Sequence, residues 1–331
     1  MRTTRSSSRV SINRLTRASG RTAEPFFEQL ESRQLLAATV LNPIADFSIQ
    51  RNSAATVIDL APRFDDPNLT GTILRWNTVL GSFSLELFDQ AGPGRTRTTP
   101  LSVANFLQYV NADRFTNTIF HRSVQNFIVQ GGGFTRPTTN NQIAPSVPQF
   151  AQVLNEPGNT NARGTIAYAK LGPDAPNGGP NSATNQFFFN TGTSNASNLD
   201  SQNGGFTVFG RVIGNGMTIV DAIANLPRVD LRPRFPGQGS NSFVSAANEV
   251  PIRGTLAANV ITPDNYASVN SISTAPELTY TVTSGNPVVV AATLVNNQVR
   301  LTYGANRVGV ANITVRATSA DGSFVDDVFT V

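Results

Sequence analysis

The stretch from Phe120 to Phe134 constrains the fold more than any other part of the chain. It places the only histidine, His121, directly before Arg122, with apolar residues close to both. Residues 127–129 form a short apolar run that predicts a buried strand, and three consecutive glycines end it after Gln130. A guanidinium, an amide and apolar side chains are therefore predicted to lie close together on adjoining short strands.

Further motifs follow this stretch in a fixed order. Phe-His-Arg, five intervening residues, an apolar pair and Gln-Gly-Gly resemble the signature of the cyclophilins, a family of peptidyl-prolyl cis-trans isomerases. Residues 164–169, 181–188 and 206–212 resemble later cyclophilin blocks in the same order. The resemblance covers roughly residues 70–228, about half of the chain.

The resemblance implies roles for individual residues. Arg122 takes the position of the catalytic guanidinium, and Gln130 takes that of the anchor for the substrate backbone. His121 belongs to the motif without being the main catalyst, and a packed histidine with one satisfied nitrogen is its other interpretation. The remaining positions carried over from the family line or flank the substrate groove: Phe127, Ile128, Ala169, Gln186, Phe188, Leu199 and Phe206.

The reaction that the resemblance implies needs few catalytic groups. An X-Pro peptide bond turns over slowly because resonance stiffens its C–N bond. No covalent bond changes, so no nucleophile, metal or cofactor is expected. A fixed donor near the twisted nitrogen and an apolar pocket for the proline ring suffice. The sequence predicts an isomerase acting on proline-containing polypeptides; the alternative is a surface module that binds such peptides without turnover.

Three positions depart from the eukaryotic members of the family. Asn198 stands where these members often carry a tryptophan, Phe206 where they carry a groove histidine, and Lys170 where they carry an asparagine. Residues 155–157 and 161–165 fit the pattern of exported bacterial cyclophilins better. These changes bear on sensitivity to cyclosporin more than on isomerisation, because the arginine, the glutamine and the apolar floor remain.

The predicted fold class is mainly β. Alternation over 82–88 directs Phe83, Leu85 and Leu87 to a core. Apolar residues at helical spacing predict amphipathic helices over 99–110 and 217–224. Two helices and about eight short strands suit the fold that the resemblance implies, a closed eight-stranded barrel with a helix over each open end. A small β-sandwich is predicted in addition.

The chain divides into five predicted regions. Residues 1–38 form a disordered basic tail or export segment, 39–69 the opening strands of a sandwich, 70–228 the isomerase domain, 229–275 a linker, and 276–331 further sandwich strands. The outer strand regions resemble cadherin-like or immunoglobulin-like sandwiches.

Neither outer piece is long enough to form a domain alone. We therefore hypothesise one discontinuous domain made of residues 43–67 and 276–331, with the barrel inserted between them.

Charge and composition exclude several functions. Residues 1–37 hold seven Arg and three Glu, whereas the remainder holds 18 basic and 18 acidic residues. No folded basic surface is therefore expected, and nucleic-acid binding is not predicted. The chain has no cysteine and one histidine, which excludes thiol and multi-histidine metal sites. Asp65 and Asp66 fit a turn better than a calcium site.

Export is predicted from the N-terminus. Residues 27–37 resemble a short segment near the start of many surface or exported proteins of planctomycetes; a short amphipathic helix in a tail is the alternative. An organelle transit peptide remains a further interpretation. No run approaches the roughly 20 apolar residues of a membrane span. The predicted location is exported or at the cell surface, with association through the sandwich; the alternative is cytoplasmic.

Overall fold

The computed structural model describes residues 38–257 and 260–331. The basic tail and the segment that predicted export lie outside the described residues, except for Ala38. No helix among the described residues is both long enough and apolar enough to cross a membrane.

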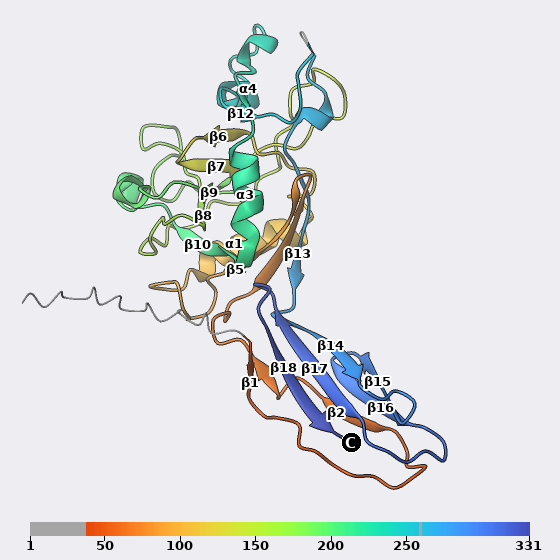
Figure 1. The fold of residues 1–331 in the computed structure, drawn as a ribbon. Helices are drawn as coiled ribbons and strands as arrows, with labels where there is room; N and C mark the ends of the chain where they lie inside the picture. Colours follow the sequence, from red (N-terminus) through yellow and green to blue (C-terminus); the bar gives the residue numbers. More distant parts are fainter. Residues whose placement is uncertain (1–37, 258–259) are drawn as a thin grey trace, which may run out of the picture. The chain divides into compact units, whose positions relative to one another are not determined.

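The described residues form many strands and few helices (Figure 1). The helices are α1 (Pro100–Asn111), α2 (Ala196–Leu199), α3 (Met217–Ala224) and α4 (Ser242–Ala246). The first half of the strands comprises β1 (Thr39–Val40), β2 (Thr56–Asp59), β3 (Phe64–Asp65), β4 (Ile73–Thr78), β5 (Gly81–Leu87), β6 (Arg122–Val124), β7 (Ile128–Gly131), β8 (Thr165–Tyr168) and β9 (Phe187–Asn190). The second half comprises β10 (Val208–Ile213), β11 (Arg228–Val229), β12 (Val250–Pro251), β13 (Val269–Ala275), β14 (Leu278–Ser284), β15 (Val290–Val295), β16 (Gln298–Tyr303), β17 (Asn312–Ser319) and β18 (Phe324–Thr330).

The largest sheet holds eight antiparallel strands in the order β13-β4-β5-β10-β8-β9-β7-β6. The prediction of a closed barrel is wrong, because the two edge strands, β13 and β6, do not pair with each other. Near them there is only an isolated bridge, between Ile119 and Ser268. β6 is three residues long, and the Ser123 N–H donates to the carbonyl of Glu249 at 2.8 Å. A different segment thus occupies the outer edge of β6, and the sheet stays open.

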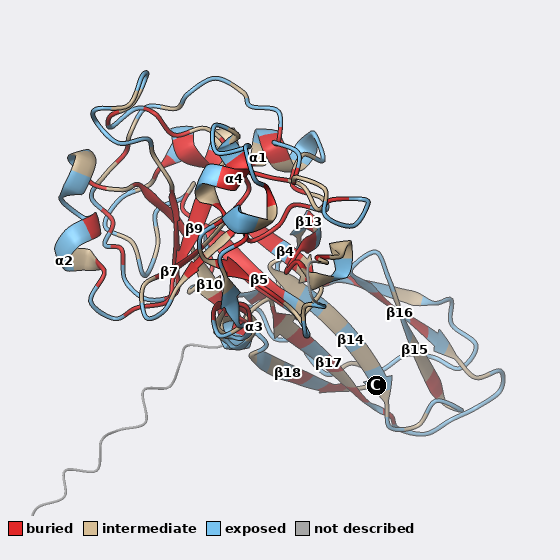
Figure 2. Ribbon diagram, turned by 90° about the horizontal axis from the view of Figure 1, so that it is seen from above, coloured by how far each residue is buried: buried red, intermediate tan, exposed pale blue. Residues whose placement is uncertain are grey.

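The inner face of this sheet carries the main hydrophobic core. Phe83, Leu85 and Leu87 of β5 are buried in it, as their alternation predicted. Helix α1 begins with Pro at its first turn and packs Val103 and Phe106 against the same core, and α3 adds three residues from its apolar face. Figure 2 shows buried residues concentrated in the central strands of this sheet. Both predicted helices are therefore present and pack against the core.

The prediction of a linker at 229–275 is wrong. Residues 269–275 form β13, which pairs with β4 along its length and is an edge strand of the large sheet. The segment before it carries α4 and β12, and its apolar residues form a buried cluster with Ile119 and Phe134. Low periodicity concealed this packing, since irregular segments bury side chains without a repeating pattern. The large sheet consequently includes a strand from outside residues 70–228.

Two three-stranded sheets make up the C-terminal region. Their orders are β14-β17-β18 and β15-β16-β2, and buried residues from both sheets form one cluster. Strand β2 pairs with β16 in antiparallel register, with Ile58 opposite Val299 and Thr56 opposite Leu301. Figure 1 shows β2, coloured orange, beside the blue C-terminal strands. This is the pairing that the hypothesis of a discontinuous domain requires.

The acidic turn at 64–68 is more ordered than predicted. Residues 64–65 form β3, which pairs with β1. Asp66 is buried, and its Oδ2 accepts a hydrogen bond of 2.5 Å from the Ser319 hydroxyl. No group of three or more His, Cys, Asp or Glu able to hold a metal ion occurs among the residues that the structure describes.

Candidate active site

A row of side chains crosses four strands on the outer face of the large sheet. The register aligns Arg122 with Gln130, Gln130 with Phe188, and Phe188 with Ala167. Directly opposite residues share one face of a sheet, and successive residues of a strand alternate between faces. Val129 and Phe189, the strand neighbours of this row, accordingly lie in the inner core. Pairing thus brings the predicted guanidinium, amide and aromatic ring onto one surface.

Phe188 and Ala167 of this row belong to a second apolar cluster, which forms the floor of a candidate groove. It is separate from the inner core, and its partly buried members form a rim. Buried members are Phe88, Ile128, Ala167, Phe188, Leu199 and Val208; rim members are Val124, Phe127, Ala169 and Phe206. An apolar floor with an accessible rim can receive one small ring and exclude water from it.

Backbone hydrogen bonds fix the loop that carries Phe127. Its carbonyl accepts the N–H groups of Thr191 and Gly192 at 2.9 and 3.0 Å and the side-chain amide of Asn195 at 2.7 Å. Asn195 also donates to the Oδ1 of Asn190 at 2.7 Å, and both asparagines are buried. These contacts lock the Phe127 side of the rim to β9.

The opposite side of the rim is aromatic and positively charged. The rings of Phe188 and Phe206 meet edge to face, with centroids 5.7 Å apart. Lys170 Nζ lies 4.8 Å from the centroid of Phe206 and donates to the carbonyls of Asn203 and Gly205 at 2.8 and 2.7 Å. Burial lowers the pKa of Lys170 to about 8. The position that departs from the asparagine pattern therefore holds an ammonium that carbonyl groups and an aromatic face stabilise.

A relay of two amides and an imidazole orients Gln130. Gln130 Nε2 donates to Gln186 Oε1 at 2.8 Å, and Gln186 in turn hydrogen-bonds to His121. His121 is 1% exposed, and burial, followed by the charge of Arg122, lowers its pKa to about 4. The imidazole is neutral at pH 7 and serves as a packed support, in agreement with the structural interpretation of this residue.

Arg122 lies at the edge of the site and is one-third exposed. Its Nε is 3.5 Å from Glu249 Oε2, and both side chains are 34% exposed. The terminal nitrogens of this guanidinium make no hydrogen bond to any residue in the described part of the chain. The carboxylate thus touches the guanidinium from one side and leaves its fork available.

Glycines after Gln130 make room for this arrangement. Gly132 has φ of +81°, a backbone conformation that side chains other than glycine rarely adopt. A Cβ at Gly133 would lie 3.0 Å from the amide carbon of Gln186. The triple glycine therefore allows the close approach of the glutamine that supports Gln130.

All nine residues predicted for the site belong to this surface. Eight lie in the apolar cluster, in its rim or in the row that crosses the strands. The ninth, Gln186, lines an adjoining polar pocket of about 250 Å³ together with Ala169 and Lys170. The sequence prediction omitted five contributors: Phe88, Val124, Ala167, Val208 and Glu249. Alternate residues of a strand share one face, so the predicted role of Ala169 could have led to Ala167, two residues earlier. No motif or spacing near Glu249 connects it with the other site residues.

A family model and several known proteins match the part of the chain that holds the candidate site. The family model described as "Cyclophilin type peptidyl-prolyl cis-trans isomerase/CLD" matches residues 73–237. A peptidyl-prolyl cis-trans isomerase of Acinetobacter baylyi is 38% identical over 159 residues, covering 48% of this chain and 75% of that protein. Peptidyl-prolyl cis-trans isomerase A of Dickeya dadantii is 33% identical over 184 residues, covering 55% of this chain and 86% of that protein.

Solved structures of cyclophilins also align with the chain. One is a cyclophilin-type peptidyl-prolyl cis-trans isomerase of Cryptosporidium parvum, with 21% sequence identity and a TM-score of 0.39. The alignment covers 62% of this chain and 99% of that structure.

Proposed function

The chain belongs to the cyclophilin family of peptidyl-prolyl cis-trans isomerases, and we propose that Arg122 is the group that accelerates the reaction. Rotation about an X-Pro bond removes amide resonance, so the proline nitrogen becomes pyramidal and more basic. A donor that binds this nitrogen only in the twisted state lowers the barrier. The free fork of Arg122 beside an apolar floor is the observation that carries the proposal.

Glu249 orients that fork. An ion pair of 3.5 Å between side chains that are one-third exposed contributes little to stability, at most about 1 kcal/mol. It does restrict the rotamers of a long side chain, and it contacts Nε, which leaves the terminal nitrogens directed elsewhere. Glu249 is therefore a positioning residue in this proposal, supplied by the segment between β11 and β13.

Gln130 anchors the backbone of the substrate next to the proline. Its amide is held by Gln186, which neutral His121 supports from below. Because the Gln130 amide is fixed in this way, its free N–H and its carbonyl oxygen are each held in one orientation. Less conformational entropy is therefore lost when the substrate binds. The proline ring packs on the apolar floor between Phe127 and Phe206, above Phe188.

A protease-coupled assay on a short peptide containing Ala-Pro tests the proposal. The chain is expected to accelerate isomerisation, and Arg122→Ala is expected to remove most of the acceleration while peptide binding persists. Binding of the peptide without acceleration by the unaltered chain would instead assign the groove to the alternative, a module that binds proline peptides.

Location is a separate proposal. We propose that the chain acts on exported proteins and that its C-terminal sheets form a small sandwich that associates with the cell surface. The resemblance of residues 27–37 to segments of exported planctomycete proteins supports export. Fractionation of producing cells, followed by immunoblotting, tests it: recovery of the chain in the cytoplasm alone contradicts export.

A further inference from the structure

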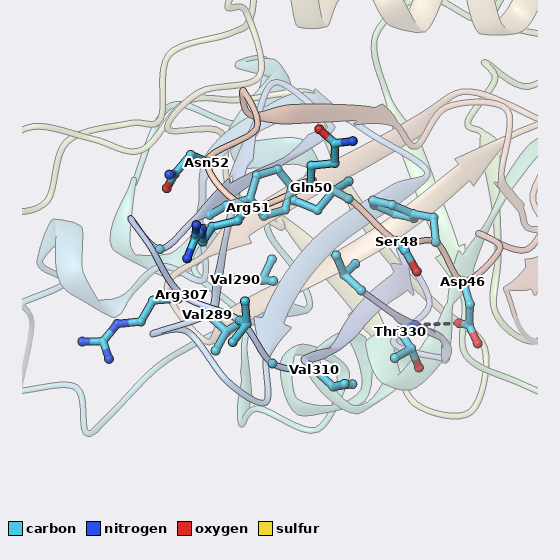
Figure 3. A pocket seen from close by; sticks show the side chains of 17 residues that line it. Asp46, Ser48, Gln50, Arg51, Asn52, Val289, Val290, Arg307, Val310 and Thr330 are labelled. Atoms are coloured by element: carbon cyan, nitrogen blue, oxygen red, sulfur yellow. Dashed lines mark hydrogen bonds between the residues drawn. The ribbon is translucent and has the colours of Figure 1, made fainter.

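A groove of about 440 Å³ lies in the C-terminal region, among residues that take no part in the candidate active site (Figure 3). Two segments without regular secondary structure, residues 46–52 and 304–310, supply most of its lining. The ends of β15, β16 and β18 complete it. We call it the arginine groove, after Arg51 and Arg307.

Apolar side chains stand exposed along the arginine groove. Val308 is 80% exposed, Val310 65% and Ile49 37%. Single exposed apolar residues are ordinary, but three that line one concave surface mark an interaction site. Beneath them the groove is anchored to the core, because Phe47 stacks on Phe329 with ring centroids 6.1 Å apart.

Backbone N–H groups along the groove are also unpaired. The N–H groups of residues 48–50 and 308–310 donate no hydrogen bond to any residue that the structure describes. At one end Asn52 Nδ2 donates to Asn306 Oδ1 at 3.0 Å, and the Asn306 N–H donates to Asn52 Oδ1 at 2.8 Å. The two segments are thus joined at one point and open along the rest, which is the condition for adding a strand through backbone pairing.

The charges of the groove are polarised. Arg51 and Arg307 form no ion pair with any described carboxylate, and Figure 3 places them toward one end. Asp46 lies at the other end, where its Oδ1 accepts the Thr330 N–H at 2.6 Å. Two unpaired guanidinium groups at one end of an apolar groove complement a carboxylate on the occupant.

We propose that the arginine groove binds an extended acidic segment of another polypeptide. The segment pairs its backbone with residues 48–50 or 308–310, places alternate apolar side chains against Val308 and Val310, and directs a carboxylate to Arg51 and Arg307. This site would tether a partner protein independently of the isomerase groove. Backbone pairing gives affinity, and the apolar and charged contacts give specificity.

Fluorescence anisotropy with the full chain and a labelled, proline-free probe tests the proposal. The probe is Asp-Val-Thr-Val-Thr-Val, and its comparison is Lys-Val-Thr-Val-Thr-Val. The acidic probe is expected to bind saturably and the basic one at least about tenfold more weakly. The double variant Arg51→Ala with Arg307→Ala is expected to weaken the acidic probe about tenfold, and Val308→Asp to abolish its binding.

Matched controls lie on the same sheets. Arg300→Ala removes an exposed arginine of β16 outside the groove, and Val57→Asp changes an exposed valine of β2 outside it. Both variants, and Arg122→Ala in the isomerase site, are expected to bind the probe as the unaltered chain does. Thermal unfolding of each groove variant, followed by circular dichroism, verifies that the C-terminal sheets remain folded.

Several outcomes overturn the proposal. They are absence of binding, equal affinity for the two probes, and unchanged affinity in the double arginine variant. Undiminished binding of a probe N-methylated at every second residue would also overturn it, since backbone pairing requires those N–H groups. Concentration-dependent self-association that Val308→Asp abolishes, without probe binding, would assign the groove to a second copy of the chain.

Discussion

The isomerase groove and the arginine groove differ in whether their polar groups already have partners within the protein. In the isomerase groove the polar groups around the floor are held by the protein: Gln130 by Gln186, and the Phe127 carbonyl by three donors. In the arginine groove the rim N–H groups and both guanidinium groups have no partner in the described chain. One surface is preorganised before a ligand arrives, and the other is completed by its ligand.

The difference follows from the task of each surface. A catalyst must hold its donor where charge develops in the transition state, so its side chains need fixed neighbours. A tether needs only affinity, which unpaired backbone and exposed valines supply. Substitutions in the isomerase site should therefore change rates or unfolding, whereas those in the arginine groove should change only binding.

The largest expected effect concerns how the two regions fold. Strand β2 contributes Ile58 to the C-terminal cluster, and Leu60 and Phe64 follow it. We propose that residues 43–67 and 276–331 form one discontinuous domain. A fragment of residues 70–275 is expected to isomerise, while residues 276–331 alone should show no cooperative unfolding by circular dichroism. Cooperative unfolding of the short fragment would contradict the single domain.

The next effect is on catalysis. Arg122→Ala is expected to lower kcat/KM by about two to three orders of magnitude, because the donor to the twisted nitrogen is lost. Arg122→Lys should restore little, since an ammonium lacks the planar fork. The free energy of unfolding should change little, because the side chain is one-third exposed. Near-normal activity of the alanine variant, in the protease-coupled assay, would remove Arg122 from the mechanism.

Phe188 and Phe189 provide a matched pair on opposite faces of β9. Phe188→Ala is expected to lower the free energy of unfolding by about 3 kcal/mol and also to weaken peptide binding. Phe189→Ala opens a cavity in the inner core and should cost about as much stability without changing peptide affinity per folded molecule. Calorimetric titration below the melting temperature separates the two effects; equal affinities would make Phe188 ordinary core.

Acid should destabilise the isomerase region through His121. Its pKa falls from an ordinary 6.5 in the unfolded chain to about 4 in the folded one, so the unfolded chain binds the extra proton. The contribution of His121 to the free energy of unfolding is fully present above pH 6.5. It is lost as the pH falls to 4, which lowers the free energy of unfolding by about 3 kcal/mol. In the His121→Asn variant, the free energy of unfolding, measured with urea at several pH values, should lack this loss at low pH. The same dependence of that free energy on pH in both proteins would contradict the prediction.

The smallest effect tests the positioning of the catalyst. Glu249→Gln is expected to lower kcat by about two- to fivefold with little change in KM, because the pair contributes at most about 1 kcal/mol. Asp264→Asn, which removes an exposed partner of Arg136 at 3.6 Å, is the control and should leave kcat unchanged. Equal kcat values for Glu249→Gln and the unaltered chain would show that Arg122 needs no such contact.

Local pattern was enough to predict much of the molecule. Both long helices and the alternation of β5 were predicted from spacing, because periodicity reports the buried face of a single element. The nine site residues came from motifs, and the structure brings them together because Arg122, Gln130 and Phe188 occupy one register across three strands. Their chemical roles were inferred from the family and not from the pattern itself.

By itself, the sequence determined the family, the two long helices and the alternation of β5. Only the tertiary structure decided that β13 joins the large sheet, that this sheet stays open, and that Glu249 reaches Arg122. It also decided that β2 pairs with β16, a strand far from it in the sequence. Such contacts carry no local signature, because each depends on which distant surfaces remain unburied once the individual elements have formed.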